Sequence, residues 1–168
     1  MIIEFLADGF EEIEALTPVD ILRRAGCDVK CVSVNKTKTV VGAHGIKVEA
    51  DITAEEAEKL ALSPEMIILP GGMPGAKNLD ESEIVDTFIK KAEKNGSYLA
   101  AICAAPMILG KRGILSGKRA TCFPGFEEKL AGAVCTGEGV VTDGPVTTGK
   151  GMGWSLDLGL ELVRLLTD

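Results

Sequence analysis

Short runs rich in apolar and β-branched residues alternate with amphipathic stretches along the whole chain. This alternation predicts repeated β-α units around a mainly parallel sheet, because parallel strands need a crossover connection, which is usually a helix. The run Met66–Leu69 is apolar without a break, as expected for a strand covered on both faces, and it ends at Pro70-Gly71-Gly72. We therefore expect an α/β fold in three layers.

The hydrophobic periodicity and the turn residues indicate where the individual elements lie. The clearest helix is predicted for 82–95, because Val85, Phe88 and Ile89 fall on one helical face. Gly96 is expected to end it. Further helices are predicted for 11–25, 55–61, 104–111 and 154–166. Strands are predicted for 1–7, 29–34, 39–41, 46–48, 66–69, 98–102, 119–122, 140–142 and 146–148.

The length and charge of the chain limit its possible partners. With 168 residues it is long enough for one core, and we expect a single domain over residues 1–168. No apolar run approaches the roughly 20 residues that cross a bilayer, so no membrane span is predicted. The formal net charge of -7 argues against a nucleic-acid partner, because phosphate-binding surfaces are built from clustered Lys and Arg. Small molecules or proteins are the expected partners.

The cellular compartment is predicted from the first residues and from the cysteines. Met1–Ala7 is apolar, but it lacks a basic leader and runs into acidic residues, unlike a secretion signal. The five cysteines are irregularly spaced, which is typical of reduced thiols and not of a disulfide framework. We therefore expect a cytoplasmic protein.

Cys103 lies where the predicted strand 98–102 passes directly into a helix, between small neighbours that permit the tight turn of a nucleophile elbow. The positive end of the following helix is expected to lower the pKa of the thiol and to favour the thiolate. The backbone amides of Gly71 and Gly72 are candidates for an oxyanion or carboxylate pocket. The alternative is a buried structural cysteine, because free Cys is among the most buried residue types.

Glu14 is the acid best placed to work with Cys103. It shares the start of a predicted helix with Glu11 and Glu12, where the helix dipole favours carboxylates for structural reasons alone. Helical spacing lets Glu11 and Glu12 stay in water while Glu14 turns toward the sheet. A partly buried Glu has a raised pKa, so Glu14 is the candidate to keep its proton, hydrogen-bond the thiolate and act as general acid or base.

His44 is the only histidine, and it restricts the kind of site that the chain can build. A Cys-His pair needs the imidazole close to the sulfur, whereas His44 belongs to a predicted hairpin and is expected to be exposed. No metal site is predicted, because Cys27 and Cys31 have no matching cluster of ligands and suit core positions. The glycine-rich segment 149–153 lacks the ending of a phosphate-binding loop, so it is interpreted as a structural or pocket-lining turn. No cofactor is expected.

Three segments together resemble the ThiJ/PfpI superfamily: Asp8–Glu14, Leu69–Gly72 and Ala101–Pro106. The resemblance covers nearly the whole chain and points to the branch of Parkinson disease protein 7 and bacterial ThiJ-like proteins. It implies a flavodoxin-like sandwich with a nucleophile elbow, usually assembled as a homodimer.

The resemblance also implies roles for individual residues. Cys103 corresponds to the reactive nucleophile and redox sensor, and Glu14 to its protonated partner. The backbone amides of Gly72 and Ala104 correspond to a small-anion pocket. A position near the dimer-related pocket is implied for Arg24 and for His44.

Two departures from the family pattern limit what the resemblance implies. Proteolytic members have a histidine directly after the cysteine, where this chain has Ala104, so protease activity is not expected. Some members also have a histidine before the proline in the segment that corresponds to 121–124, where this chain has Phe123. Phe123 is therefore a candidate pocket residue that does not supply the chemistry of an imidazole.

The sequence is compatible with two functions. The first is cysteine-dependent, glyoxalase- or deglycase-type detoxification of reactive dicarbonyls such as methylglyoxal, or of their early adducts on proteins. The second is noncatalytic: Cys103 is oxidised to a sulfinate that a protonated Glu14 stabilises, and the protein acts as an oxidative-stress sensor or chaperone.

Overall fold

A seven-stranded sheet forms the centre of the computed structural model, which describes all residues 1–168. In spatial order the strands are β10, β11, β7, β6, β1, β2 and β5, and every neighbouring pair is parallel except the hairpin of β10 and β11. The expected mainly parallel sheet is thus confirmed. The strands span Ile2–Leu6 (β1), Val29–Ser33 (β2), Ile52–Thr53 (β5), Met66–Leu69 (β6), Tyr98–Ile102 (β7), Val140–Asp143 (β10) and Val146–Gly149 (β11).

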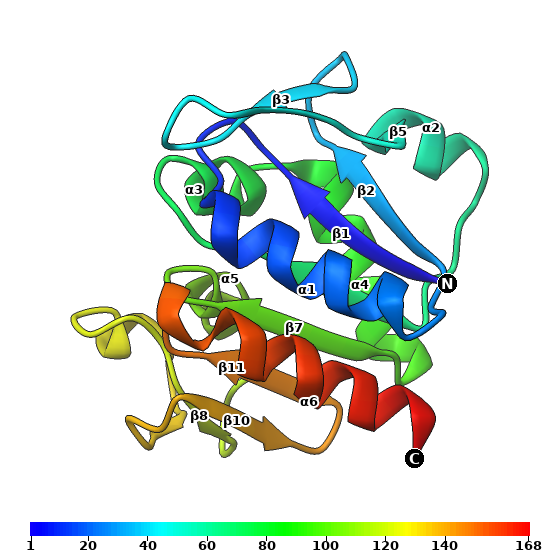
Figure 1. Cartoon of the computed structure of the whole chain (residues 1–168). Helices are drawn as coiled ribbons and strands as arrows, with labels where there is room; N and C mark the ends of the chain where they lie inside the picture. The colour runs from blue at the N-terminus through cyan, green and yellow to red at the C-terminus, as the bar shows by residue number, and fades with distance from the viewer.

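Helices cover both faces of this sheet and give the molecule the three layers seen in Figure 1. The blue α1 and the red α6 lie side by side on one face, and α2 to α5 pack on the other. This arrangement confirms the flavodoxin-like sandwich, and none of the helices has the length and apolar character needed to span a membrane. The helices span Glu12–Arg24 (α1), Ala54–Lys59 (α2), Gly75–Asp80 (α3), Glu83–Asn95 (α4), Pro106–Lys111 (α5) and Ser155–Thr167 (α6).

The central strand β6 shows why its sequence is apolar throughout. Ile67 and Leu69 belong to the core on the face of α2 to α5, whereas Met66 and Ile68 belong to the core under α1 and α6. All four side chains are fully buried. Because successive side chains point to opposite faces and both faces are covered, no position in this strand favours a polar residue.

Local capping signals fix the ends of the helices that the sequence predicts well. The Ser82 side chain accepts a hydrogen bond from the Val85 amide at the start of α4, and Gly96 ends the helix with a φ of 70°. Thr53 and Glu56 form a reciprocal capping box at the start of α2. Such caps satisfy backbone groups that the helix itself leaves unpaired.

Several elements differ from their predicted bounds. The helix expected from 104 begins only at Pro106, because residues 103–105 form a turn, and the short helix α3 was not predicted. The strand expected over 119–122 ends at Ala120, since the Thr121 amide donates to the side-chain hydroxyl of Thr148 and not to a backbone carbonyl. The remaining elements are Thr39–Val41 (β3), Lys47–Glu49 (β4), Arg119–Ala120 (β8), Glu127–Lys129 (η1), Val134–Cys135 (β9) and Met152–Trp154 (η2).

Candidate active site

The carboxyl ends of three adjacent strands, β1, β6 and β7, meet at one edge of the sheet. Each is followed by one of the predicted site segments: α1 with Glu14, the turn Gly71-Gly72, and Cys103. Their proximity is visible at Gly71, where an added Cβ would lie 2.8 Å from the Cys103 Cβ and 3.0 Å from Glu14 Oε1. The fold therefore brings the cysteine and the acid together at the crest of the sheet, where α/β proteins place their ligand sites.

Cys103 occupies a tight turn with a φ of 65°, which is rare for a residue with a side chain. Two backbone hydrogen bonds hold this conformation: the Cys103 amide donates to the Gly149 carbonyl at 2.9 Å, and the Phe123 amide donates to the Cys103 carbonyl at 2.8 Å. Such strain costs on the order of 1–3 kcal/mol and persists only where the surroundings fix it. The geometry is that of a nucleophile elbow between β7 and α5.

The glycine turn after β6 can only be built without side chains. At Gly71 an added Cβ would also come within 2.9 Å of the Ile102 carbonyl oxygen, and Gly72 has a φ of 89°. The amides of Gly72 and Ala104 donate to no oxygen of the protein. The Ala104 amide hydrogen-bonds the Cys103 sulfur, so the Gly72 amide is the donor left without a partner for a developing negative charge at this site.

Glu14 is almost completely buried, with 1% of its surface exposed, although it lies in the first turn of α1. Its backbone amide is capped by the Glu11 side chain at 2.7 Å, while its own Oε2 has no hydrogen-bond partner. Burial raises the pKa of Glu14 to about 7, against the lowering effect of a hydrogen bond with Cys103. A carboxyl group with this pKa can both accept and donate a proton near neutral pH.

The Cys103 thiol does not behave as the sequence suggested. Burial, and then the negative charge of Glu14, raise its pKa to about 12, whereas a lowered pKa was expected. The physical reason is that α5 begins at Pro106, so only the Ala104 amide acts on the sulfur, and its lowering effect is too small. Once Glu14 is ionised, the proton therefore stays on the sulfur, and the carboxylate is the group that can remove it.

His44 lies at the hairpin between β3 and β4 and contacts the start of α1. Its Nδ1 is 2.8 Å from Glu12 Oε2 and 3.8 Å from Glu11 Oε1, and the hydrogen bond with Glu12 raises the pKa of His44. Glu12, which was expected to stay in water, is buried because it also accepts the backbone amides of His44 and Ile46. The ligand atoms of Glu11, Glu12 and His44 lie within 4.8 Å of one another, so these residues could hold a metal ion.

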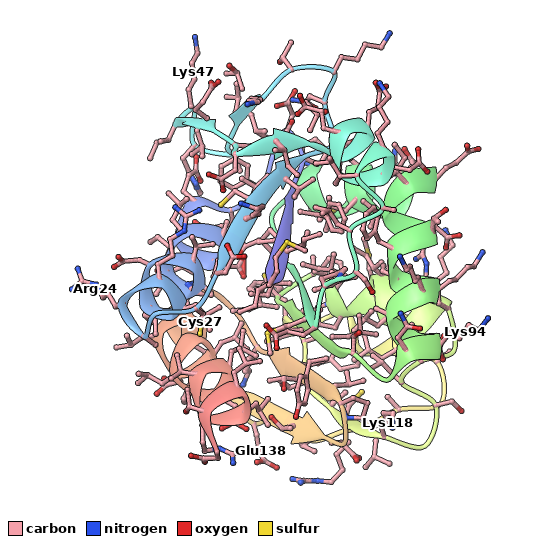
Figure 2. The ribbon with its side chains drawn as sticks, turned by 90° about the vertical axis from the view of Figure 1, so that its right-hand side faces the viewer. Arg24, Cys27, Lys47, Lys94, Lys118 and Glu138 are labelled. Atoms are coloured by element: carbon pink, nitrogen blue, oxygen red, sulfur yellow. The ribbon has the colours of Figure 1, made fainter.

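Arg24 and Phe123 are placed at very different distances from the cysteine. Arg24 lies ten residues after Glu14 on α1, roughly 15 Å along the helix axis. It is exposed, pairs with Asp20 at 3.0 Å and extends outward from the surface in Figure 2. Phe123 is next to Cys103 through its amide. Within one chain, Cys103 is therefore joined by Glu14 and Phe123 but not by Arg24.

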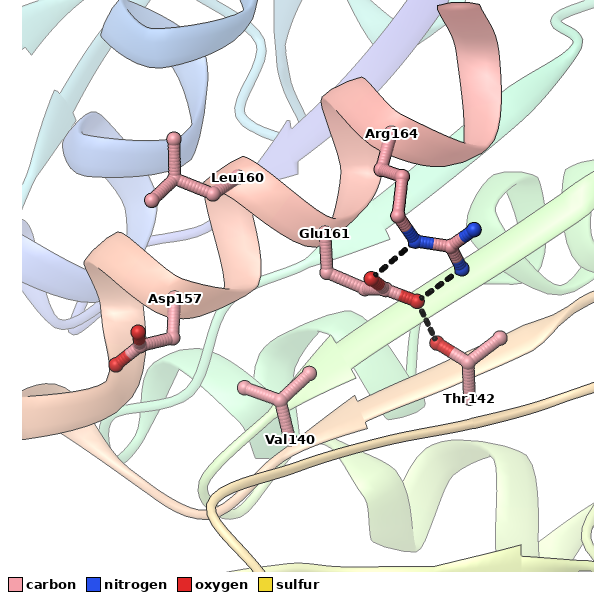
Figure 3. Close-up of a pocket in the computed structure, with 6 residues that line it drawn as sticks. All are labelled: Val140, Thr142, Asp157, Leu160, Glu161 and Arg164. Carbon is pink, nitrogen blue, oxygen red and sulfur yellow. Dashed lines mark hydrogen bonds and ion pairs between the residues drawn. The ribbon is translucent and has the colours of Figure 1, made fainter. Parts of the chain in front are cut away.

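A separate hollow of about 420 Å³ lies between β10 and α6, away from all the predicted site residues (Figure 3). Two carboxylates line it, Asp157 and Glu161, of which Glu161 accepts hydrogen bonds from Arg164 and from the Thr142 hydroxyl, each at 2.8 Å. These partners satisfy Glu161. The lining of the hollow contains no cysteine or histidine.

Comparison with known proteins is consistent with this geometry. The sequence profile of the DJ-1/PfpI family matches residues 2–165. The chain belongs to the DJ-1/PfpI family. Within this family, the oxidised form of Toxoplasma gondii DJ-1 has a similar structure, with a TM-score of 0.94 and 31% identity over 99% of this chain and 90% of that one. The likeness extends over the whole sandwich.

Curated members of the DJ-1/PfpI family show similar levels of identity. Protein DJ-1 homolog B of Arabidopsis thaliana is 38% identical over 96% of this chain, but the chain spans only 37% of that protein. Glutathione-independent glyoxalase DJR-1.2 of Caenorhabditis elegans is 31% identical over 93% of this chain and 82% of its own length.

Proposed function

We propose that this chain is a cofactor-free glyoxalase that converts 2-oxoaldehydes such as methylglyoxal into 2-hydroxy acids. The observation that carries the proposal is the buried Glu14, with a pKa of about 7, beside Cys103 on its elbow. The Gly72 amide makes no hydrogen bond within the protein, and the Ala104 amide, whose partner is the Cys103 sulfur, is the second candidate donor to an oxyanion. A relative named as a glutathione-independent glyoxalase supports the same chemistry.

The first step forms a bond between the Cys103 sulfur and the aldehyde carbon. The Glu14 carboxylate takes the thiol proton as the sulfur attacks, so the thiol does not have to ionise beforehand despite its high pKa. The former carbonyl oxygen becomes negative, lies at the Gly72 and Ala104 amides, and receives the proton from Glu14. The product of this step is a hemithioacetal.

The second step moves hydrogen between adjacent carbons. Glu14 removes the proton from the sulfur-bearing carbon, which gives an enediol as the hydroxyl proton of that carbon passes to the neighbouring oxygen. Glu14 then returns its proton to the second carbon, which becomes the alcohol carbon. The first carbon is thereby oxidised to a thioester and the second is reduced, so no external oxidant or reductant takes part. Water then cleaves the thioester, which releases the 2-hydroxy acid and returns the thiol proton.

The deciding experiment measures lactate formed from methylglyoxal by the reduced protein. We expect turnover to disappear in Cys103→Ala and to fall by at least about 100-fold in Glu14→Gln, the scale of general acid-base catalysis. Cys135→Ala, which removes an exposed cysteine outside the site, is the matched control and should retain turnover. Absence of lactate with the wild-type protein, or equal activity in Cys103→Ala, would refute the proposal.

The same addition chemistry also suits early dicarbonyl adducts on proteins, which makes a modified protein the second proposed substrate. A deglycase activity predicts release of the 2-hydroxy acid from a freshly glycated peptide. The measurement is mass spectrometry of the peptide with wild-type protein and with Cys103→Ala. Restoration of the unmodified peptide at equal rates in both samples would exclude a role for the cysteine.

A second candidate function is oxidation sensing, which the oxidised state of the Toxoplasma gondii relative favours. Two equivalents of peroxide would convert the Cys103 thiol into a sulfinate and release two waters, with protonated Glu14 donating to the new oxygens. Mass spectrometry after mild peroxide should then locate two added oxygens on Cys103. Equal oxidation of all five cysteines would exclude a selective sensor.

We also propose that the chain forms a homodimer in the cytoplasm, where its five free cysteines would stay reduced. The outer face of α1 and α6 carries the exposed apolar side chains Ile13, Leu156 and Leu160, which a second copy would cover. Light scattering after size exclusion should give twice the chain mass of 17.7 kDa. A monomer mass across the micromolar range would contradict the dimer.

A further inference from the structure

Phe123 is an aromatic residue whose backbone is joined to the elbow. Its amide donates to the Cys103 carbonyl at 2.8 Å, which fixes the Phe123 backbone relative to the elbow. Nevertheless, 48% of the Phe123 surface is exposed. Large apolar side chains near a reaction centre that stay accessible are candidates for contact with a ligand.

The Phe123 ring is held by packing on the sides that do not face solvent. Phe126 meets it edge to face, with the ring centres 6.3 Å apart and an angle of 75° between the rings. An added Cβ at Gly151 would lie 3.6 Å from the Phe123 ring, which places the glycine-rich segment beside the ring. That segment is itself tied to the elbow, because the Gly149 carbonyl accepts the Cys103 amide. A ring fixed in this way loses little freedom when a ligand stacks on it.

The two ends of a 2-oxoaldehyde substrate have different requirements at the site around Cys103. The aldehyde end needs the sulfur, the Glu14 carboxyl and the backbone amides of Gly72 and Ala104, all of which are polar. The group attached to the ketone carbon takes no part in the reaction, and Phe123 offers it an apolar aromatic surface. The nearby cation Lys129 lies over the Phe126 ring at 5.6 Å, so it is engaged with the second ring of the pair.

We propose that Phe123 is a specificity-determining residue that favours 2-oxoaldehydes with an aromatic or bulky apolar group, such as phenylglyoxal, over methylglyoxal. This inference rests on the proposed glyoxalase function and names its substrate class. Phe123 acts through contact with the substrate's nonreacting group and moves no proton. Its contribution therefore appears as a difference between two substrates.

The test compares kcat/KM for phenylglyoxal and methylglyoxal in the wild-type protein, Phe123→Ala and Phe123→Leu. For each protein, kcat/KM for phenylglyoxal is divided by kcat/KM for methylglyoxal. Comparing this ratio between proteins removes the difference in intrinsic reactivity between the two substrates. We expect the ratio to fall about tenfold in Phe123→Ala, mainly through KM, and by less in Phe123→Leu, which keeps an apolar side chain. Leu60→Ala, which shortens an exposed apolar side chain at the end of α2, should leave the ratio within about twofold. An unchanged ratio in Phe123→Ala would overturn the inference.

A binding measurement separates failure of this inference from failure of the glyoxalase function. Phenylglyoxylate and pyruvate are matched 2-oxo acids that differ only in phenyl and methyl groups, and neither is an aldehyde. We expect phenylglyoxylate to slow iodoacetamide alkylation of Cys103 at lower concentration than pyruvate, and Phe123→Ala to abolish this difference. Equal protection by both acids in the wild-type protein would reject an aromatic-selective site even if lactate is formed, whereas selective protection without turnover would reject only the enzyme.

Discussion

At the scale of single residues, the site depends on two ionisable groups whose pKa values are both raised by burial. Glu14 titrates near neutrality while the Cys103 thiol keeps its proton to about pH 12. The reactive state is therefore expected to be the ionised acid beside the neutral thiol, with proton transfer during attack. A thiolate formed in advance is not needed for this chemistry.

This charge state predicts the pH dependence of the reaction. Because the Glu14 carboxylate is the base, kcat/KM for methylglyoxal should rise as the pH increases through about 7 and then level off. The pH profile measured from about pH 5 to about pH 9 checks this expectation. In Glu14→Gln, the residual activity should lack that step; a step that persists at the same pH would assign the base to another group.

Glu4 is a second buried acid, and it predicts an effect on stability. It lies on β1 with 0% exposure, neither carboxyl oxygen has a hydrogen-bond partner, and burial raises its pKa well above the usual value. The folded state therefore retains a proton that the unfolded chain releases above about pH 4.3. The stabilisation from this proton is complete below that pH and is lost as the pH rises toward the folded-state pKa.

The measurement is urea unfolding of the wild-type protein and Glu4→Gln at about pH 5 and about pH 8. The wild-type free energy of unfolding should fall more between these two pH values than that of the variant, because Gln does not titrate. Parallel changes in the two proteins would show that Glu4 is not the group responsible.

At the scale of elements, Arg112 links three helices on one face of the sheet. From the end of α5 it donates to Asp80 of α3 at 2.7 Å and to Asp86 of α4 at 2.8 Å, and only 14% of its side chain is exposed. It also donates to the Ile108 carbonyl within its own helix. Because α3 and α5 are short, such side-chain links matter more for them than helix propensity does.

Removing this link should destabilise the fold measurably. We expect Arg112→Ala to lower the free energy of unfolding by about 2–3 kcal/mol, since it leaves the half-buried Asp80 and Asp86 carboxylates with fewer partners. Thermal or denaturant unfolding measures the loss. Lys90→Ala, which removes an exposed partner of Asp86, is the control and should cost less than about 1 kcal/mol. Equal losses in the two variants would contradict the linking role.

At the scale of the whole molecule, the site exists because three segments far apart in the sequence end at one edge of the sheet. Gly71 lies where they meet, between Cys103 and Glu14. A methyl group added at Gly71 would collide with the Cys103 side chain and with the backbone carbonyl of Ile102. Extra volume in close-packed surroundings lowers the stability of the folded protein.

We therefore expect Gly71→Ala to reduce lactate formation strongly and to lower stability by about 1–3 kcal/mol. Lactate production and thermal unfolding are measured on the same samples. Gly26→Ala is a useful comparison, because an added Cβ there meets no neighbour, although its positive φ of 83° still causes strain. Full activity in Gly71→Ala would show that the three segments are less tightly packed than the structure indicates.

The sequence by itself determined the order of the longer strands and helices and the segments that carry the candidate site. Local signals were sufficient for this, since the apolar run Met66–Leu69, the cap at Ser82 and the small residues around Cys103 act within a few residues. Elements as short as α3 and β5 lack such signals, because their stability comes from the neighbours on which they pack.

Only the tertiary structure decided the charge states of the site. The hairpin buries Glu12, and the converging strand ends bury Glu14 and Cys103 enough to raise the pKa of both. Burial depends on what the rest of the chain places around a side chain. Residue type and spacing predicted the candidate reactive groups, while desolvation by distant segments set where their protons reside.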